Sequence, residues 1–293
     1  MTQSVSFNRW IWIAVAVLIF FILISQIWNS GRGDDGLSLG PKVGVVTLEG
    51  PIFDSKPVIE DFDEIAERND VKAIVFRINS PGGAVAPSQE IYEKVKKVNN
   101  VVPIITSIGT VAASGGYYSA LGSTLIMANP GSVTGSIGVI MDYPVATDLL
   151  EKIGLRFETV KSGSLKDAGS PTREVTEQDR DYFKDVVHDM HTQFVEAVAE
   201  GRNLDQNTVK ELANGRVFTG RQSYQLGLID SLGTFDDAVA LAAEIGNIDG
   251  KPKLARPHKE KPQFMEWLLQ EAATTLGYFL NKEPAYRWHW RVS

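Results

Sequence analysis

The chain contains no cysteine among its 293 residues. This absence excludes disulfide bonds, thiolate zinc sites and a cysteine nucleophile, so covalent catalysis would have to use serine, threonine, lysine or a carboxylate. Positive charge is also scarce, since 29 Lys and Arg stand against 36 Asp and Glu and give a formal net charge of −7. A nucleic-acid-binding domain normally carries a basic surplus, so we expect no nucleic-acid partner.

Histidine is rare, with four in the chain. His188 and His191 lie within one helical pattern, with Asp189 between them, and they lack the HExxH arrangement of a zinc protease. We interpret both as surface or half-buried helix residues, and we expect no metal site. No histidine is in a convincing position for a catalytic triad.

The N-terminus holds a long hydrophobic run. Every residue from Trp10 to Ile24 is apolar, and no charge occurs between Arg9 and Arg32. Such a run is long enough to cross a hydrocarbon core of about 30 Å. Because no small-x-small cleavage site follows it, we expect residues 10–28 to be a retained transmembrane anchor rather than a cleaved signal peptide. Residues 1–9 would precede the anchor as a short segment.

Beyond a polar, glycine-rich linker over residues 29–40, the pattern predicts an α/β domain over residues 41–247. Short apolar segments alternate with helical patterns, which indicates a mostly parallel sheet with flanking helices and a ligand site beyond the carboxyl ends of the strands. Strands are predicted at 43–48, 73–78, 104–108, 125–128 and 157–160. Helices are predicted at 58–68, 88–98, 176–201, 207–213 and 235–245, with a further one opening around residue 114.

Residues 248–293 form a basic C-terminal tail. From Lys251 onward, eight Lys and Arg stand against four Glu. Leu268, Leu269 and Leu276 belong to an apolar stripe at helical spacing. We interpret this amphipathic helix as a packing helix, with a membrane-surface helix as the alternative.

Ser114 is the candidate nucleophile. It follows a predicted strand and precedes a predicted helix, where unpaired N–H groups and the helix dipole would stabilise a neighbouring oxyanion. The same position also suits a serine that only caps the helix, and the local sequence leaves both interpretations open. The turn Ser80-Pro81-Gly82-Gly83 ends another predicted strand and can supply further amide donors.

A serine nucleophile needs a base, and a lysine removed from water can serve because burial favours its neutral form. The candidates are Lys161 and Lys166, which stand in the polar stretch 161–171. Each of them, taken singly, is more often a solvated surface charge than a base. These residues by themselves leave the choice open.

Four motifs occur together and in a defined order. They are Ser-Pro-Gly-Gly at 80–83, Ala-Ala-Ser-Gly-Gly-Tyr-Tyr at 112–118, Gly-Ser-Val-Thr-Gly-Ser-Ile-Gly-Val at 131–139 and Lys-Asp-Ala-Gly-Ser-Pro at 166–171. Over about residues 43–246 the chain thereby resembles the signal peptide peptidase A family of serine peptidases, in its short form with a single unit. The resemblance implies a fold like that of ClpP and the crotonases, and cleavage of remnant signal peptides in or beside the membrane.

Site roles follow from the same resemblance. It implies Ser114 as the nucleophile and Lys166, which precedes Asp167, as the general base, and it demotes Lys161. It also implies that the hydroxyl of Ser136 holds the lysine amine.

The resemblance further implies an oxyanion hole made by the backbone N–H groups of Gly83 and Gly115, with Gly82 as an alternative donor. Attack of the serine on the scissile carbonyl would give an acyl-enzyme that water hydrolyses, and this mechanism needs neither a metal nor an organic cofactor.

Partners and location are implied in the same way. Peptide substrates would be unfolded and apolar, and membrane lipid would surround the anchor. The chain would be a single-pass protein of the inner (cytoplasmic) membrane, with its catalytic domain on the extracytoplasmic side. Because long family members take serine and lysine from different halves, we expect a ring-like homo-oligomer whose sites combine Ser114 and Lys166 of adjacent subunits.

Two other functions are compatible with such a fold. A crotonase-like acyl-CoA hydratase or isomerase would also use glycine-rich oxyanion turns, and a catalytically inactive membrane scaffold would need no site at all. The serine–lysine pair and the anchor favour the peptidase, because thioester chemistry on a soluble cofactor requires neither.

Overall fold

The computed structural model of this protein describes residues 40–258. The chain divides into a compact unit that ends at Arg256 and a second unit from Pro257, of which only Pro257 and His258 are described. The predicted anchor at 10–28 and the predicted tail helix both lie outside the described residues. Within the described range, no helix is long and apolar enough to cross a membrane.

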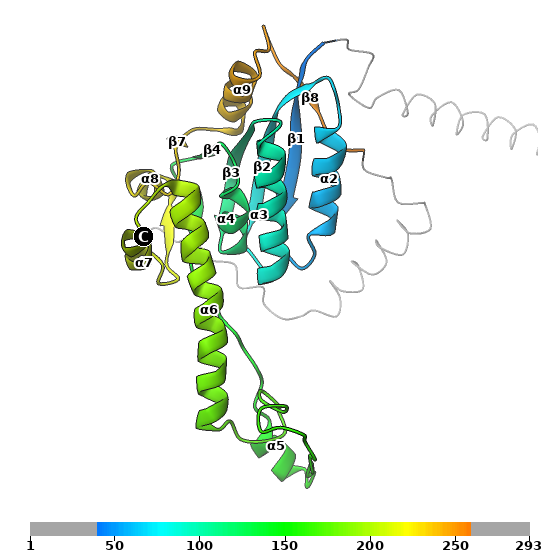
Figure 1. Cartoon of the computed structure of the whole chain (residues 1–293), viewed down its shortest axis with the longest axis vertical. Coiled ribbons are helices and arrows are strands. Elements are labelled where there is room, and N and C mark those ends of the chain that lie inside the picture. Colours follow the sequence, from blue (N-terminus) through cyan, green and yellow to red (C-terminus); the bar gives the residue numbers. More distant parts are fainter. Residues whose placement is uncertain (1–39, 259–293) are drawn as a thin grey trace, which may run out of the picture. The chain divides into compact units, whose positions relative to one another are not determined.

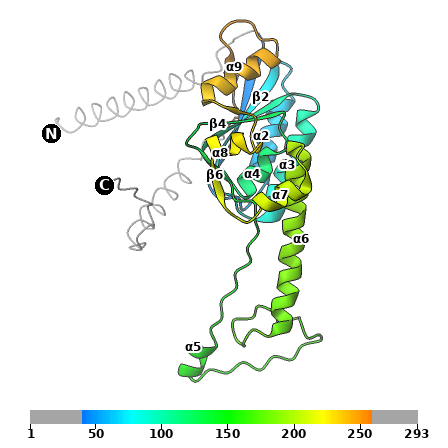
Figure 2. The same cartoon turned by 90° about the vertical axis from the view of Figure 1, so that its left-hand side faces the viewer.

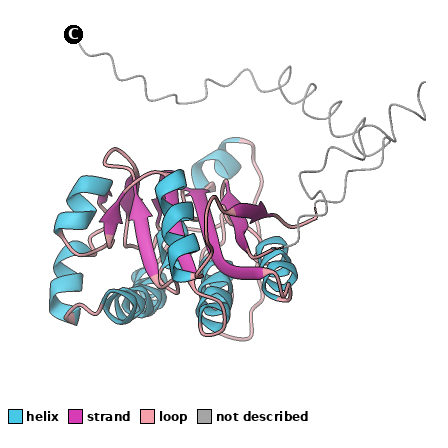
Figure 3. Cartoon of the chain, turned by 90° about the horizontal axis from the view of Figure 1, so that it is seen from above, coloured by secondary structure: helices cyan, strands magenta, loops and turns pink. Residues whose placement is uncertain are grey.

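The centre of the unit is a mixed sheet with mostly parallel pairing (Figures 1 and 3). Its path runs β6-β5-β3-β2-β1-β8, with β4 beside β3 and β7 beside β4, and the β5–β6 pair is antiparallel. The strands are β1 (Lys42–Glu49), β2 (Val71–Ser80), β3 (Ile104–Ala113), β4 (Leu125–Ala128), β5 (Val133–Gly135), β6 (Val217–Thr219), β7 (Ser231–Leu232) and β8 (Lys253–Ala255).

Helices cover both faces of this sheet, which explains why the long strands are apolar on both sides. On one face Phe62, Ile91 and Phe194 join a core with the strands, and on the other Ala238 and Ala242 pack against them. The helices are α2 (Lys56–Ala66), α3 (Val85–Asn99), α4 (Gly115–Ala120), α5 (Thr147–Lys152), α6 (Glu177–Arg202), α7 (Gln206–Leu212), α8 (Gly220–Gln225) and α9 (Phe235–Ile245).

Most predicted elements are confirmed, and the exceptions lie after β4. The strand predicted at 157–160 is wrong, because that segment is exposed and pairs with no strand. The short elements α5, α8 and β5 to β8 were not predicted, since each has too few residues to show a period. The sheet also extends to Ala255, beyond the domain end expected at residue 247.

The helix α6 begins away from the sheet and runs back to it (Figures 1 and 2). Thr176 caps it in a capping box with Asp179. Its C-terminal half packs into the core through Phe194 and Val198, whereas Phe183 near its start is only half-buried. We call residues 139–183 the arm: it comprises the segment after Gly138, α5, a turn and the beginning of α6.

Candidate active site

Ser114 is held in an unusual backbone conformation between β3 and α4. Its φ is 51° and its ψ is −122°, and its N–H donates to the carbonyl of Gly135 at 2.9 Å. The hydroxyl makes no capping hydrogen bond to α4, although the residue occupies the cap position. A capping role therefore does not account for this serine.

Two serines of the site, Ser114 and Ser136, have a positive φ, which is rare for residues other than glycine. Among the described non-glycine residues, Ser114, Ser136, Asn203 and Asn247 have φ near 50°. The two asparagines lie at or just after helix ends, where asparagine adopts this conformation readily. A serine there is strained, and strain that the fold maintains tends to occur at functional sites. Ser114 and Ser136 share this feature and line the same groove.

The glycine turn after β2 lies against Ser114. A Cβ on Gly82 would come within 2.8 Å of Ser114 Cβ, and a Cβ on Gly83 would lie 2.1 Å from the carbonyl oxygen of Ile52. No larger residue fits at either position without a shift of the backbone. The turn brings the backbone of residues 82–83 to the N-terminus of α4.

Of the three backbone amides in this contact, one is occupied and two are available to a ligand. The N–H of Gly82 is the occupied one, since it donates to Ser80 Oγ at 3.2 Å. Within the part of the chain that the structure describes, the N–H groups of Gly83 and Gly115 have no hydrogen-bond acceptor. The Gly83 nitrogen would lie 3.3 Å from a Cβ placed on Gly115, so the two amides are close together. This arrangement favours Gly83 over Gly82 as an oxyanion donor.

A groove of about 810 Å³ opens in front of Ser114. Its lining contains cationic and apolar side chains but no aspartate or glutamate, although the chain as a whole is acidic. The lining residues are Pro81, Gly82, Gly83, Val85, Ser114, Ser136, Gly138, Val139, Ile140, Lys184, Val187, His188, His191, Ala213, Asn214 and Gly215. The groove is large enough for a short peptide segment, and it would favour neutral or anionic ligands.

A small apolar recess continues from this groove below Ser114. Its volume is only about 20 Å³. Its walls include Val85, Tyr118, Met190 and Phe194, which come from α3, α4 and α6. A recess of this size beside Ser114 suits a small apolar side chain.

Sequence reasoning did not place three residues of α6 in the groove. Lys184, His188 and His191 occur at i, i+4 and i+7 and line it from one face of the helix. His191 Nε2 lies 2.8 Å from the carbonyl oxygen of Ala213, whereas His188 is exposed. Their spacing shows that they share a face, but only the fold turns that face toward Ser114.

Lys166 does not line this groove. It lies in the arm, in a turn where its N–H donates to the carbonyl of Gly163 at 3.1 Å, and its side chain is exposed. The segment between α5 and α6 that contains this turn lies away from the sheet (Figures 1 and 2). A single chain therefore brings Ser114, Ser136, Gly83 and Gly115 together and leaves Lys166 apart.

The residue after Lys166 is held by two cations. Asp167 Oδ1 accepts hydrogen bonds from Lys161 Nζ at 2.7 Å and from Arg173 Nη2 at 2.9 Å. These bonds, that of Arg173 above all, lower the pKa of Asp167 to about 2. Arg173 also bonds Asp179, and this bond together with those from Thr176 holds the pKa of Asp179 well below its usual range.

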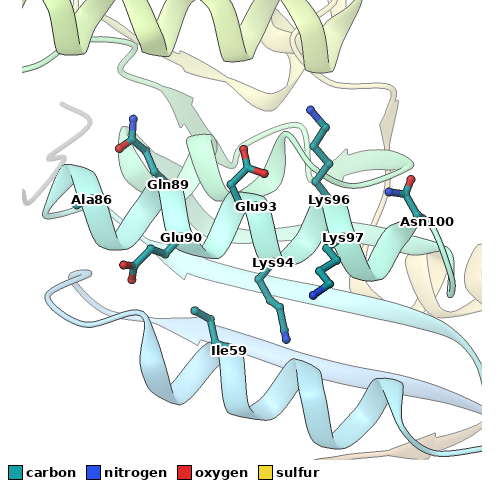
Figure 4. Close-up of a pocket in the computed structure, with 9 residues that line it drawn as sticks. All are labelled: Ile59, Ala86, Gln89, Glu90, Glu93, Lys94, Lys96, Lys97 and Asn100. Atoms are coloured by element: carbon teal, nitrogen blue, oxygen red, sulfur yellow. The ribbon is translucent and has the colours of Figure 1, made fainter.

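A second groove, of about 860 Å³, is lined by α3 and the residue after it, with Ile59 of α2 at one side (Figure 4). Its lining is largely charged, with Glu90, Lys94 and Lys96 engaged by Ser55, Asp63 and Glu200 respectively, and it contains no serine or threonine. It therefore offers no hydroxyl nucleophile. Over residues 40–258 no three histidine, aspartate or glutamate side chains form a group that would hold a metal ion.

Comparison with known proteins gives two family matches. Residues 96–249, about half of the chain, match "Peptidase family S49", and residues 44–131 match "Clp protease". Ser114 falls in both ranges, whereas Ser136 and Lys166 fall only in the first. The second match agrees with the parallel sheet and its flanking helices.

Relatives with similar sequences carry protease names. A Synechocystis sp. protein named as a protease is 42% identical over 210 residues, which cover 71% of this chain and 76% of that protein. A protein of Enterococcus faecium named as signal peptide peptidase SppA is 39% identical over 188 residues, covering 64% of this chain and 55% of its own length. A solved structure of a membrane-bound stomatin-specific protease is 18% identical with a TM-score of 0.48, and it covers 75% of this chain and all of that one.

Proposed function

Because this chain belongs to peptidase family S49, the family of signal peptide peptidase A, we propose that it is a serine endopeptidase with Ser114 as nucleophile and Lys166 as general base. Membership of the family makes it a serine-type peptidase. The observation that carries the choice of nucleophile is the strained Ser114, whose hydroxyl caps nothing and which adjoins the two available amides of Gly83 and Gly115.

The proposed reaction begins when the neutral amine of Lys166 takes the proton of the Ser114 hydroxyl. The oxygen attacks the scissile carbonyl, and the negative charge that develops is stabilised by the N–H groups of Gly83 and Gly115. The protonated amine then gives its proton to the leaving nitrogen as the peptide bond breaks. Water, deprotonated by the same amine, attacks the acyl-enzyme and releases the second product.

Ser136 is the residue that we propose to orient the amine. It lines the same groove as Ser114, and its N–H donates to the carbonyl of Arg216 at 2.9 Å, which fixes the strained backbone there. Within the described residues its hydroxyl has no hydrogen-bond partner, so it is available to a lysine that enters the groove.

The proposed substrates are unfolded apolar peptides, in particular signal peptides left after cleavage from their proteins. The apolar recess beside Ser114 suits a small hydrophobic side chain, of which signal sequences contain many. The SppA name of the Enterococcus faecium relative points in the same direction. The rival acyl-CoA chemistry loses support, because the family matches are both to peptidases.

We propose that the site is completed by a second copy of this chain. The arm carries the exposed Lys166 together with apolar side chains that have no cover in a single chain. The largest exposed fractions are those of Ile140 (85%), Leu149 (61%), Ile153 (63%) and Val160 (101%). Burying such a surface on a neighbour would stabilise an oligomer and would bring the amine of one subunit to the serine of the next.

Membrane attachment is proposed from residues 10–28, with the catalytic domain on the extracytoplasmic side. The uncharged run supports an anchor, and the side rests on the family. We expect protease added outside intact inner-membrane vesicles of native orientation to digest the domain and leave an anchor fragment that retains residues 10–28. Digestion from the cytoplasmic side alone would contradict this orientation.

A fluorophosphonate probe tests the nucleophile. We expect it to label the full-length protein at Ser114 and to leave the Ser114→Ala variant unlabelled, because only an activated serine reacts with it. Ser136→Ala removes the other strained serine of the groove and retains the nucleophile. It should still be labelled at Ser114, but more slowly, because Ser136 orients the proposed base. Labelling of Ser114→Ala, or none of the wild-type protein, would contradict the proposal.

A further inference from the structure

An arginine joins the turn that carries Lys166 to the first turn of α6. Arg173 Nη1 and Nη2 donate to the two carboxylate oxygens of Asp179 at 2.5 and 2.9 Å, and Nη2 also donates to Asp167 Oδ1 at 2.9 Å. Asp179 is 1% exposed and closes the capping box with Thr176. The guanidinium thus connects the residue next to Lys166 to a fixed point on the helix.

Packing supports the same connection. Gly169, three residues after Lys166, has a φ of +74°, and a Cβ there would lie 3.1 Å from the ring of Phe183. The centroid of the Phe183 ring lies 4.9 Å from that of Tyr143, which belongs to the segment of the arm before α5. The turn therefore rests on an aromatic pair as well as on the arginine.

The carboxylate of Asp167, the residue next to Lys166, already has two cationic partners. Asp167 Oδ1 bonds Lys161 and Arg173, while the side chain of Lys166 has no ion-pair partner within the described residues. A carboxylate within about 4–6 Å of a lysine favours its ammonium form by 1–3 pH units, and the ammonium form cannot accept a proton. Release of Asp167 would leave such a carboxylate free beside Lys166, the residue that directly precedes it in sequence.

We propose that Lys161 and Arg173 are positioning residues for Lys166: they hold the Asp167 carboxylate away from its amine, and Arg173 ties the turn to α6. This inference rests on the proposed function, since it takes Lys166 as the general base. It gives a role to Lys161, which was the alternative candidate for the base, and to Arg173, which is far from Ser114 in sequence.

The arm carries other carboxylates besides Asp167. Glu174 accepts a hydrogen bond from Thr147, Asp179 is held by Arg173, and Asp181 pairs with Lys184. The others are Asp142, Asp148, Glu151, Glu158 and Glu177. In the groove that the amine would enter, the ionisable side chains are Lys184, His188 and His191, and none of them is a carboxylate. Asp167 is the carboxylate adjacent to Lys166 in the chain, so we expect its position to have the largest effect on the base.

The test is the pH dependence of kcat/KM for the full-length protein in detergent, with a fluorogenic apolar peptide. For Lys161→Gln and for Arg173→Gln we expect the pH of half-maximal activity to rise by roughly one unit. Adding Asp167→Asn to either variant should return it to the wild-type value, because the freed carboxylate is then absent. Lys152→Gln removes another cation of the arm that does not contact Asp167, and it should leave the value unchanged.

Equal loss of activity at every pH, without a shift and without recovery on adding Asp167→Asn, would show a purely structural role and overturn the inference. If Arg173→Gln fails to fold, Lys161→Gln decides, because it leaves the Arg173–Asp179 pair in place. The Lys166→Ala variant separates the proposed function from this inference. If it is inactive, Lys166 remains the base, and a missing pH shift contradicts only the roles of Lys161 and Arg173. If it is active, the base assignment fails and this inference fails with it.

Discussion

At the scale of single residues, the site is defined by backbone conformation as much as by side chains. The strain at Ser114 and Ser136 is maintained by hydrogen bonds to Gly135 and Arg216, which belong to the paired strand β5 and to the segment leading into β6. Strained positions of this kind persist when their surroundings determine them. The surrounding sheet therefore fixes the conformation of Ser114 without a bound substrate.

The two lysines of the arm should differ in their effect on activity. We expect Lys166→Ala to reduce peptide hydrolysis by at least about 10²-fold, the lower end of what a general base contributes. Lys161→Ala should retain activity at alkaline pH, because it removes a partner of Asp167 and not the base. The measurement is kcat/KM across a pH series, in which wild-type activity should rise toward alkaline pH as the lysine amine becomes neutral.

Circular dichroism of both variants serves as the folding control. An inactive Lys161→Ala together with an active Lys166→Ala would reverse the assignment. A limb near pH 6.5 that disappears when His188 or His191 is replaced would point to a histidine base, which the position of these residues in the groove makes a direct test.

At the scale of elements, the arm depends on ionised carboxylates. Arg173 and Lys161 lower the pKa of Asp167 from 3.8 to about 2, and Arg173 and Thr176 lower that of Asp179. A carboxyl whose pKa is lowered on folding stabilises the fold fully above its unfolded pKa, and this contribution is lost as the pH falls through the folded value. The contribution of Asp167 should therefore be lost as the pH falls from about 4 to about 2, and that of Asp179 should be lost at still lower pH.

Hydrogen exchange measures this loss locally. We expect amides of residues 176–183 at the start of α6 to lose protection over that pH range, after correction for the intrinsic exchange rate. The start of α3 is the matched control, since its cap residue Ala84 has no carboxylate partner. Equal loss of protection in both helices would indicate global acid unfolding instead of loosening of the arm.

At the scale of the whole molecule, a single chain separates the two proposed catalytic residues. Ser114 lies at the sheet, and Lys166 lies on an arm whose apolar side chains are exposed. A shared site resolves both observations, because a neighbour would cover the arm and receive its lysine.

Co-assembly of two inactive variants tests the shared site. When Ser114→Ala and Lys166→Ala chains are expressed together, some sites combine an intact Ser114 with an intact Lys166 from a neighbour. We expect these mixtures to recover a fraction of wild-type peptide hydrolysis, up to about a quarter for random two-chain sites. Differential tags confirm mixed oligomers, and an inactive mixture in confirmed hetero-oligomers would place the complete dyad within one subunit.

The local pattern of the sequence was sufficient for the long elements, whereas the roles of Ser114, Ser136 and Lys166 stay predictions from the family resemblance. Strands β1 to β4 were predictable because each contains a short apolar run, and the long helices because each repeats an apolar period over several turns. The order of four motifs indicated the family, and the match over residues 96–249 confirms it.

Tertiary structure decided which of these residues meet. The orientation of α6 places Lys184, His188 and His191 in the groove of Ser114, and the bonds of Ile52 and Ser80 leave the Gly83 amide available while occupying that of Gly82. The exposed arm, with 157–160 outside the sheet, separates Lys166 from Ser114. The physical reason is range: capping and periodicity act between neighbours in sequence, whereas contacts between segments depend on how the whole sheet and its helices pack.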